Sequence, residues 1–256
     1  MLISAQCVDH ITDLSSVEIR LGDVRPDLTD VGEQVFMIKK VVKHPQFYAN
    51  AYYNDIALLE LDNKNGTKVG TCVKFDNYVQ PVCLPKTYVE LLRIMKPKHH
   101  FLVFKKHPFF NSTFHDEVRE GTMCQVAGYH VQQNLGKEPK TMDTVLSTFV
   151  PFNECNVGAL GVDPYEFVCN RYGDKNGCIM DFGATYTCES NERMVNTIWG
   201  IAGFMQNYHQ CGRLVYNMFT SVANFRCWID KTLQANGVDN STNANPFVCD
   251  KDGRRF

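Results

Sequence analysis

The chain has 256 residues and a formal net charge of −2, with 44% hydrophobic and 21% charged residues. These values exclude a disordered chain and fit one large domain, or two small ones that share a core. The nearly balanced charge provides no general field that would favour nucleic acid or an anionic membrane. The sequence also lacks an apolar run of about 18 residues, so we expect no membrane span.

Short runs rich in β-branched and aromatic residues recur along the chain, with turn residues between them. They lie at 16–23, 34–42, 55–61, 122–131, 143–150, 197–204 and 216–222. This spacing predicts an all-β sandwich or barrel fold. One helix is predicted at about 222–235, because apolar residues recur on one face and Gly237 provides a stop; these residues are Val222, Phe225, Ile229 and Leu233.

Two segments differ from this β-rich pattern. Residues 86–119 include a basic, histidine-rich and aromatic stretch, and residues 236–256 form a polar tail. We interpret the first as a solvated insertion loop, with a binding site for an acidic ligand at 96–107 as the alternative. Three histidines in it could ligate a metal, but no Asp, Glu or Cys lies at a ligand spacing from His99, His100 and His107. No metal site is therefore predicted.

Cysteine usage indicates the compartment. The chain has 11 cysteines, which are spread out rather than grouped in paired CxxC knuckles. This pattern favours disulfides over zinc and hence an oxidising, extracellular environment. Three N-x-S/T tripeptides agree with secretion and are candidate glycosylation sites, at Asn65, Asn111 and Asn240. The first residues do not have the pattern of a signal peptide, because they lack a basic start and an unbroken apolar run.

Six segments resemble, in the same order, the landmarks of trypsin-like serine proteases. They are "LISAQC" (2–7), "HP" (44–45), "NDIALLEL" (54–61), "PVCLP" (81–85), "VAGY" (126–129) and "CIMDFGATYTC" (178–188). A single piece such as "VAGY" is a weak signal, but six in one order are specific. The likeness covers about residues 1–235.

The resemblance implies two packed antiparallel six-stranded Greek-key barrels, an active-site cleft between them and a C-terminal helix. The first barrel would occupy about residues 1–110 and the second about 119–222. It also implies three disulfides and leaves five cysteines unassigned. The implied bridges are Cys155–Cys169, Cys124–Cys188 and Cys178–Cys211, and the unassigned residues are Cys7, Cys72, Cys83, Cys227 and Cys249.

Cys7 bears on where the domain begins, because in the family its usual partner lies upstream. We therefore expect the first barrel to lack its first strands. A truncated gene model or a fragment is the favoured explanation, and a shortened product with an open barrel edge is the alternative.

Serine protease chemistry needs a hydroxyl nucleophile, an imidazole base and a carboxylate that orients the imidazole. The resemblance places Gln6, Asp55 and Phe182 at these positions. The amide of Gln6 cannot act as a general base, and Phe182 has no nucleophilic atom. We expect the remaining carboxylate, Asp55, to be held structurally by a hydrogen bond from the Gln6 side-chain amide.

The resemblance implies further changes around these positions. Met180 occupies the glycine position of the oxyanion hole, where a side chain would crowd the backbone. Asn176 corresponds to the base of the specificity pocket, and Met205 and Asn217 correspond to small residues of its wall, so we expect a filled pocket. Asp181 is retained where an active member pairs an Asp with its newly cut amino terminus.

These expectations favour a secreted pseudoprotease without a cofactor, which acts as a binding or regulatory module for a protease, a zymogen or an inhibitor. The alternative is an active trypsin-like endopeptidase that uses displaced residues, for which Ser190, His209 and Asp174 are the candidates. A third possibility is a decaying gene whose product has no role.

Overall fold

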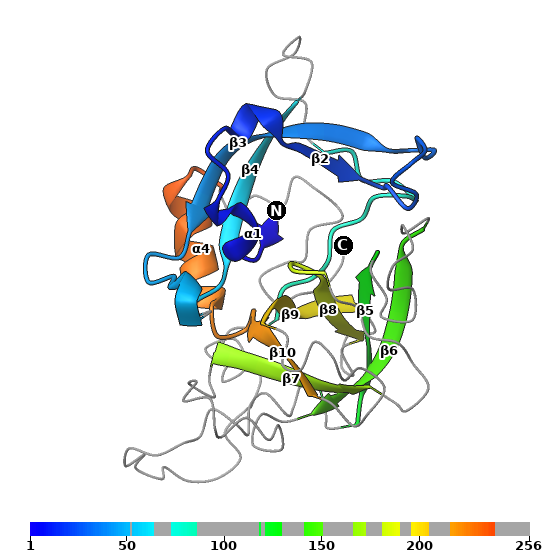
Figure 1. The fold of residues 1–256 in the computed structure, drawn as a ribbon, viewed down its shortest axis with the longest axis vertical. Coiled ribbons are helices and arrows are strands. Elements are labelled where there is room, and N and C mark those ends of the chain that lie inside the picture. Colours follow the sequence, from blue (N-terminus) through cyan, green and yellow to red (C-terminus); the bar gives the residue numbers. More distant parts are fainter. Residues whose placement is uncertain are drawn as a thin grey trace, which may run out of the picture.

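The fold consists of an open β-sheet, a closed β-barrel and a C-terminal helix (Figure 1). The computed structural model describes residues 1–51, 53–63, 73–85, 118, 121–129, 141–150, 166–172, 181–189, 196–204 and 216–238. All structural statements below concern these residues. Among them, no helix has the length and apolar character that crossing a membrane would require.

The N-terminal part forms an antiparallel sheet of four strands in the order β1-β4-β3-β2. The strands are β1 (Leu2–Ile3), β2 (Glu18–Leu21), β3 (Gln34–Lys43) and β4 (Ala57–Asn63). A short helix α1 (Gln6–Asp9) follows β1, and two 3-10 turns are present, η1 (Leu14–Ser16) and η2 (Ala49–Ala51). One face of the sheet covers a small core made of Ala5, Val8, Ile38, Ala57 and Leu59.

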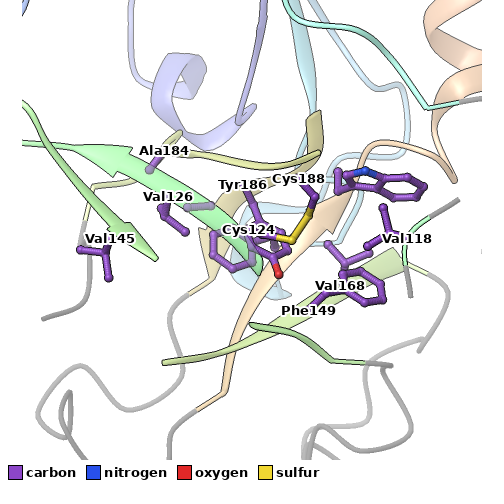
Figure 2. Packing of buried hydrophobic residues seen from close by; sticks show 12 residues of the cluster. Val118, Cys124, Val126, Val145, Phe149, Val168, Ala184, Tyr186 and Cys188 are labelled. Carbon is purple, nitrogen blue, oxygen red and sulfur yellow. A yellow bond between two sulfur atoms is a disulfide. The ribbon is translucent and has the colours of Figure 1, made fainter. Parts of the chain in front are cut away.

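Six antiparallel strands form a closed barrel in the order β10-β7-β6-β5-β8-β9. They are β5 (Met123–Gly128), β6 (Asp143–Val150), β7 (Phe167–Tyr172), β8 (Thr185–Glu189), β9 (Asn196–Phe204) and β10 (Tyr216–Ser221). Aromatic rings fill its interior (Figure 2): Tyr186 stacks on Phe219 at 4.8 Å between centroids, and Phe149 meets Trp199 edge-on at 6.4 Å. These four side chains are nearly inaccessible to solvent, so they form the centre of the core.

The helix α4 (Arg226–Ala235) joins the two halves. A second cluster combines β4, β9 and the helix region through Ile56, Leu58, Ile198, Ile201, Val222, Phe225 and Ile229. The helix ends as the sequence predicts. Gly237 has a φ of +78°, and the N–H of Val238 donates to the carbonyl of Leu233 at 3.0 Å, the pattern of a Schellman C-cap.

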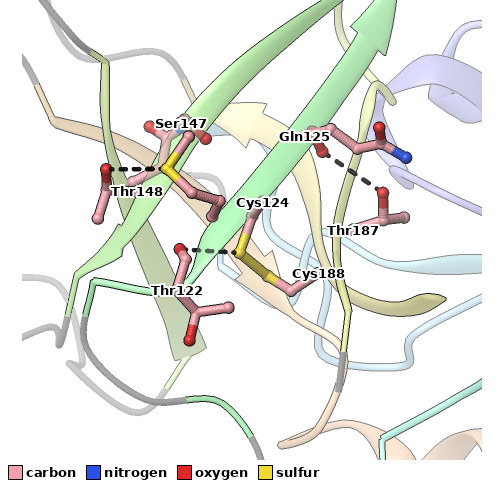
Figure 3. Close-up of a disulfide and its surroundings, with 9 residues drawn as sticks. Thr122, Cys124, Gln125, Ser147, Thr148, Thr187 and Cys188 are labelled. Carbon is pink, nitrogen blue, oxygen red and sulfur yellow. Dashed lines mark hydrogen bonds between the residues drawn. A yellow bond between two sulfur atoms is a disulfide. The ribbon is translucent and has the colours of Figure 1, made fainter. Parts of the chain in front are cut away.

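The bridge between Cys124 and Cys188 is present and links directly opposed residues of β5 and β8 (Figure 3). Cys169 and Cys83 are also disulfide-bonded. The remaining members of the implied bridges, Cys155, Cys178 and Cys211, lie outside the described residues. Cys7 is a free thiol.

The predicted all-β class with two β units and a closing helix is confirmed, and the described part of the first unit is an open sheet of four strands. Two strands of the barrel, β7 and β8, are absent from the predicted runs. In β7, the buried Asn170 and the partly buried Arg171 interrupt the apolar sequence. Its position in the barrel follows from pairing with β6 and β10 rather than from local composition.

Candidate functional site

The candidate site is centred on Asp55, which lies two residues before the start of β4 and is fully buried. Its carboxylate accepts hydrogen bonds from the Ser4 hydroxyl and the Gln6 backbone, and the backbone N–H of Ala5 also interacts with it. The hydroxyl of Ser4 lies 2.8 Å from both carboxylate oxygens, and the backbone N–H of Gln6 donates to Oδ1 at 2.8 Å. Ser4 follows β1 and Gln6 begins α1, so the carboxylate fixes the connection between these two elements.

The barrel side of this site is formed by Gly203 of β9. A Cβ atom on Gly203 would overlap Oδ2 of Asp55, so the carboxylate lies directly against the backbone of the barrel strand. Burial raises the pKa of Asp55 above its ordinary value, and the hydrogen bonds from Gln6 and Ser4 oppose this effect. Only glycine leaves enough space for this contact between the two halves.

The structure corrects the expected role of Gln6. Its backbone N–H contacts Asp55, whereas the side-chain amide does not make the predicted hydrogen bond. The side-chain oxygen Oε1 is buried and has no hydrogen-bond partner among the described residues. Since any residue other than proline provides a backbone N–H, retention of Asp55 does not depend on the identity of residue 6.

Phe182 lies in a turn that precedes β8, and half of its side-chain surface is exposed. The next residue, Gly183, has a φ of +82° and lies close to the segment that carries Gln6. A Cβ on Gly183 would be 3.2 Å from Sγ of Cys7 and 3.5 Å from Cγ1 of Ile3. The fold therefore brings the segments that carry positions 6, 55 and 182 to one region.

Two other expected site residues can be placed. Asp181 accepts a hydrogen bond from the backbone N–H of Tyr129. Asn217 of β10 is buried, and its backbone N–H donates to the side chain of Asn170 at 3.3 Å. The remaining candidate positions lie outside the described residues: Met180, Asn176, Met205, Ser190, His209, Asp174, the sequons at Asn65, Asn111 and Asn240, and the 96–107 loop with His99, His100 and His107.

A separate open groove, with a volume of about 650 Å³, lies between the end of β3 and Asn236. Two lysines line it, but both are engaged. Lys43 pairs with Asp9 at 2.6 Å, and Lys40 donates to the side chain of Asn236 at 2.7 Å. Within the described part of the chain, no group of three or more His, Cys, Asp or Glu residues could hold a metal ion.

The chemistry available at the three aligned positions is limited. Asp55 is an acceptor for two donors, Gln6 offers an amide with no usable pKa, and Phe182 offers a ring. Residues 6 and 182 thus provide neither a base nor a nucleophile, although the carboxylate and its surroundings are well ordered by hydrogen bonds.

Comparison with known proteins shows the family to which the chain belongs. The sequence model of the trypsin family matches residues 2–97 and 107–229. The chain is 23% identical to trypsin I-P1 of Gallus gallus over 225 residues, which cover 87% of this chain and 73% of that protein.

Two other relatives are longer proteins. The chain is 26% identical to the hepatocyte growth factor activator serine protease of Homo sapiens over 239 residues, covering 90% of this chain and 31% of that protein. It is 24% identical to the urokinase-type plasminogen activator of Gallus gallus over 247 residues, covering 92% of this chain and 49% of that protein.

Proposed function

The chain belongs to the trypsin family of serine proteases. Because the resemblance aligns Gln6 and Phe182 with the base and the nucleophile, we propose that it is a pseudoprotease. In this proposal it is a secreted protein that uses the protease fold as a binding or regulatory module. Its partner is a protease, a zymogen or an inhibitor, the classes of protein that contact such a fold in the family.

The observation that carries the proposal is the pair of residue types at positions 6 and 182. The resemblance aligns Gln6 with the base and Phe182 with the nucleophile, and neither side chain can accept a proton near neutral pH or attack a carbonyl. The remaining carboxylate, Asp55, accepts hydrogen bonds from the Ser4 hydroxyl and the Gln6 backbone N–H, which supports a structural role for it in the absence of an imidazole.

Extracellular placement is part of the same proposal. The disulfide between Cys124 and Cys188, and the further bonded cysteines Cys83 and Cys169, favour an oxidising compartment. Modification of the three sequons would be consistent with this compartment.

The test uses a fluorophosphonate probe, which reacts with activated serine nucleophiles, together with arginyl, tyrosyl and alanyl peptide esters. We expect neither labelling nor turnover by the protein secreted from eukaryotic cells, while an active trypsin at the same concentration shows both. Labelling that maps to any residue of this domain would establish the alternative, an endopeptidase that uses displaced residues such as Ser190.

A double variant, Gln6→His with Phe182→Ser, examines how far the loss extends. It restores the three residue types of the triad, and it should fold, because Phe182 is half exposed and its removal leaves no core cavity. We nevertheless expect no peptidase activity above background, since the resemblance implies that Met180 crowds the oxyanion position and that Met205 and Asn217 fill the specificity pocket. Robust turnover would contradict the expectation of a filled pocket.

A further inference from the structure

The loop between β2 and β3, residues 22–33, exposes apolar side chains. The exposed fractions of Val24, Leu28 and Val31 are 42%, 51% and 73%. Tyr78 and Met142, which are exposed by 59% and 39%, come from other parts of the chain. We call these five residues the apolar loop surface.

Two contacts bring the segments that carry Met142 and Tyr78 against the β2–β3 loop. The backbone N–H of Met142 donates to the carbonyl of Val24 at 2.7 Å. The ring of Tyr78 lies over Gly32, where a Cβ atom would overlap it. The apolar loop surface is therefore shared by the β2–β3 loop, the segment around Tyr78 and the start of β6.

The loop is held in one conformation by Asp30. Its carboxylate accepts hydrogen bonds from the backbone N–H groups of Val24 and Arg25, at 2.7 and 2.9 Å, and from the guanidinium of Arg25 at 2.7 Å. The N–H of Asp30 in turn donates to the carboxylate of Glu33 at 3.1 Å. Because the loop is already ordered, binding a partner there would cost little conformational entropy.

The charge around this surface is predominantly negative. Residues 22–33 contain four acidic side chains and one basic side chain: Asp23, Asp27, Asp30, Glu33 and Arg25. Arg20 of β2 neutralises part of this charge, since it lies 3.5 Å from Glu33. Of the two acids without an ion pair among the described residues, Asp27 is exposed and Asp23 has one buried carboxylate oxygen. A partner with Lys or Arg side chains would be electrostatically complementary to this unneutralised negative charge.

We propose that the apolar loop surface is a docking site for a protein that presents an apolar patch bordered by basic residues. Exposed apolar groups that cluster on an ordered loop mark interaction sites more often than scattered ones do. The acidic side chains beside them favour a partner surface with positive charge. The inference rests on the proposed binding role and names the chemistry of the partner. It concerns a surface distinct from the Asp55 site.

The test measures binding of two fluorescent peptides to the complete secreted chain by anisotropy. One peptide is an amphipathic helix of leucine and lysine, and the other is its leucine and glutamate counterpart. We expect the lysine peptide to bind at least about tenfold more tightly than the glutamate peptide, with an affinity that falls as salt rises.

Three variants locate the binding. The double variant Leu28→Ser with Val31→Ser should weaken binding of the lysine peptide at least about fivefold, and Asp27→Asn should reduce its salt dependence. Val238→Ser, which alters a side chain of similar exposure (47%) beyond the end of α4, should leave the affinity unchanged. Unaltered thermal unfolding of each variant shows that the fold is intact.

Several outcomes would overturn the proposal. The proposal is contradicted if the lysine peptide does not bind, or if both peptides bind equally. It is also contradicted if the Leu28 and Val31 variant binds the lysine peptide with unchanged affinity. Sedimentation that shows a dimer of the unliganded chain, dissociated by the same variant, would assign the surface to a second copy instead. Since the fluorophosphonate assay is read separately, a chain that neither labels nor binds the peptide would lose this docking site but keep the pseudoprotease assignment.

Discussion

Replacing Asp55 with Ala should destabilise the protein, whereas replacing it with Asn should have little effect. The Ala variant removes the acceptor for two buried donors, the Ser4 hydroxyl and the Gln6 backbone N–H. In the Asn variant, the side-chain oxygen can still accept from Gln6 and the side-chain N–H₂ can donate to the Ser4 oxygen. The pair of variants therefore separates loss of hydrogen bonds from loss of charge.

The magnitude follows from the number of donors left without a partner. Each buried unsatisfied group costs about 1–3 kcal/mol, and removing a carboxylate whose burial raises its pKa recovers part of this. We expect Asp55→Ala to lower the free energy of unfolding by about 2–4 kcal/mol, and Asp55→Asn to change it by less than about 1 kcal/mol. The loss for Ala corresponds to a fall in Tm of roughly 5–15 °C for a chain of this size.

The pH dependence provides an independent check. Because the pKa of Asp55 is raised above 3.8 in the folded state, the folded protein retains this proton more readily than the unfolded chain does. Its contribution to stability is thus unfavourable at neutral pH and improves as the pH falls through the raised pKa. The free energy of unfolding of Asp55→Asn relative to wild type should be highest at pH 7 and should decrease toward pH 4.

Urea unfolding followed by circular dichroism at pH 7 and at lower pH measures both effects. The reasoning would be refuted if Ala and Asn had equal effects at pH 7, because the hydrogen bonds would then contribute nothing. It would also be refuted if the relative stability of the Asn variant rose as the pH fell.

Two further predictions use the same assay. Gly203→Ala should lower the free energy of unfolding by roughly 1–3 kcal/mol or more, since its methyl group overlaps the Asp55 carboxylate. The loss should shrink in combination with Asp55→Ala, and an additive double variant would contradict this contact. Phe182→Ser should change stability by less than about 1 kcal/mol, because the side chain is half exposed. Phe149→Ala, in the barrel core, should lower the free energy of unfolding by about 3–5 kcal/mol. A similar loss of stability in Phe182→Ser and Phe149→Ala would show that the Phe182 side chain is packed and would contradict this prediction.

The sequence predicts the elements whose patterns are local. Apolar residues spaced by three and four predict a helix at about 222–235, and the structure has it at Arg226–Ala235. Its predicted start was four residues too early, since Val222 and Phe225 precede the helix, although both are buried together with Ile229. The strand β7 was missed because Asn170 is polar yet buried, and its hydrogen bonds come from strands distant in the sequence. Local composition cannot indicate such partners.

At the candidate site, too, the sequence predicts some features and not others. The positions of Gln6, Asp55 and Phe182 in one region follow from the order of the family landmarks. The donor to Asp55 was assigned to the wrong part of Gln6, because a residue type reveals its side chain but not the direction of its backbone N–H. The sequence also does not reveal that half of the Phe182 side-chain surface is exposed, because its place in the turn before β8 is set by the fold.

The polar residues inside the barrel have a consequence for how its strands align. Ser147 of β6, Asn170 of β7 and Asn217 of β10 are all buried, and Asn170 bridges the other two by accepting from the Asn217 N–H and donating to the Ser147 hydroxyl at 3.0 Å. A slip of one residue in either pairing would turn these side chains to the opposite face and strand buried donors without acceptors. These hydrogen bonds therefore act together with the apolar pattern in restricting three neighbouring strands to a single register.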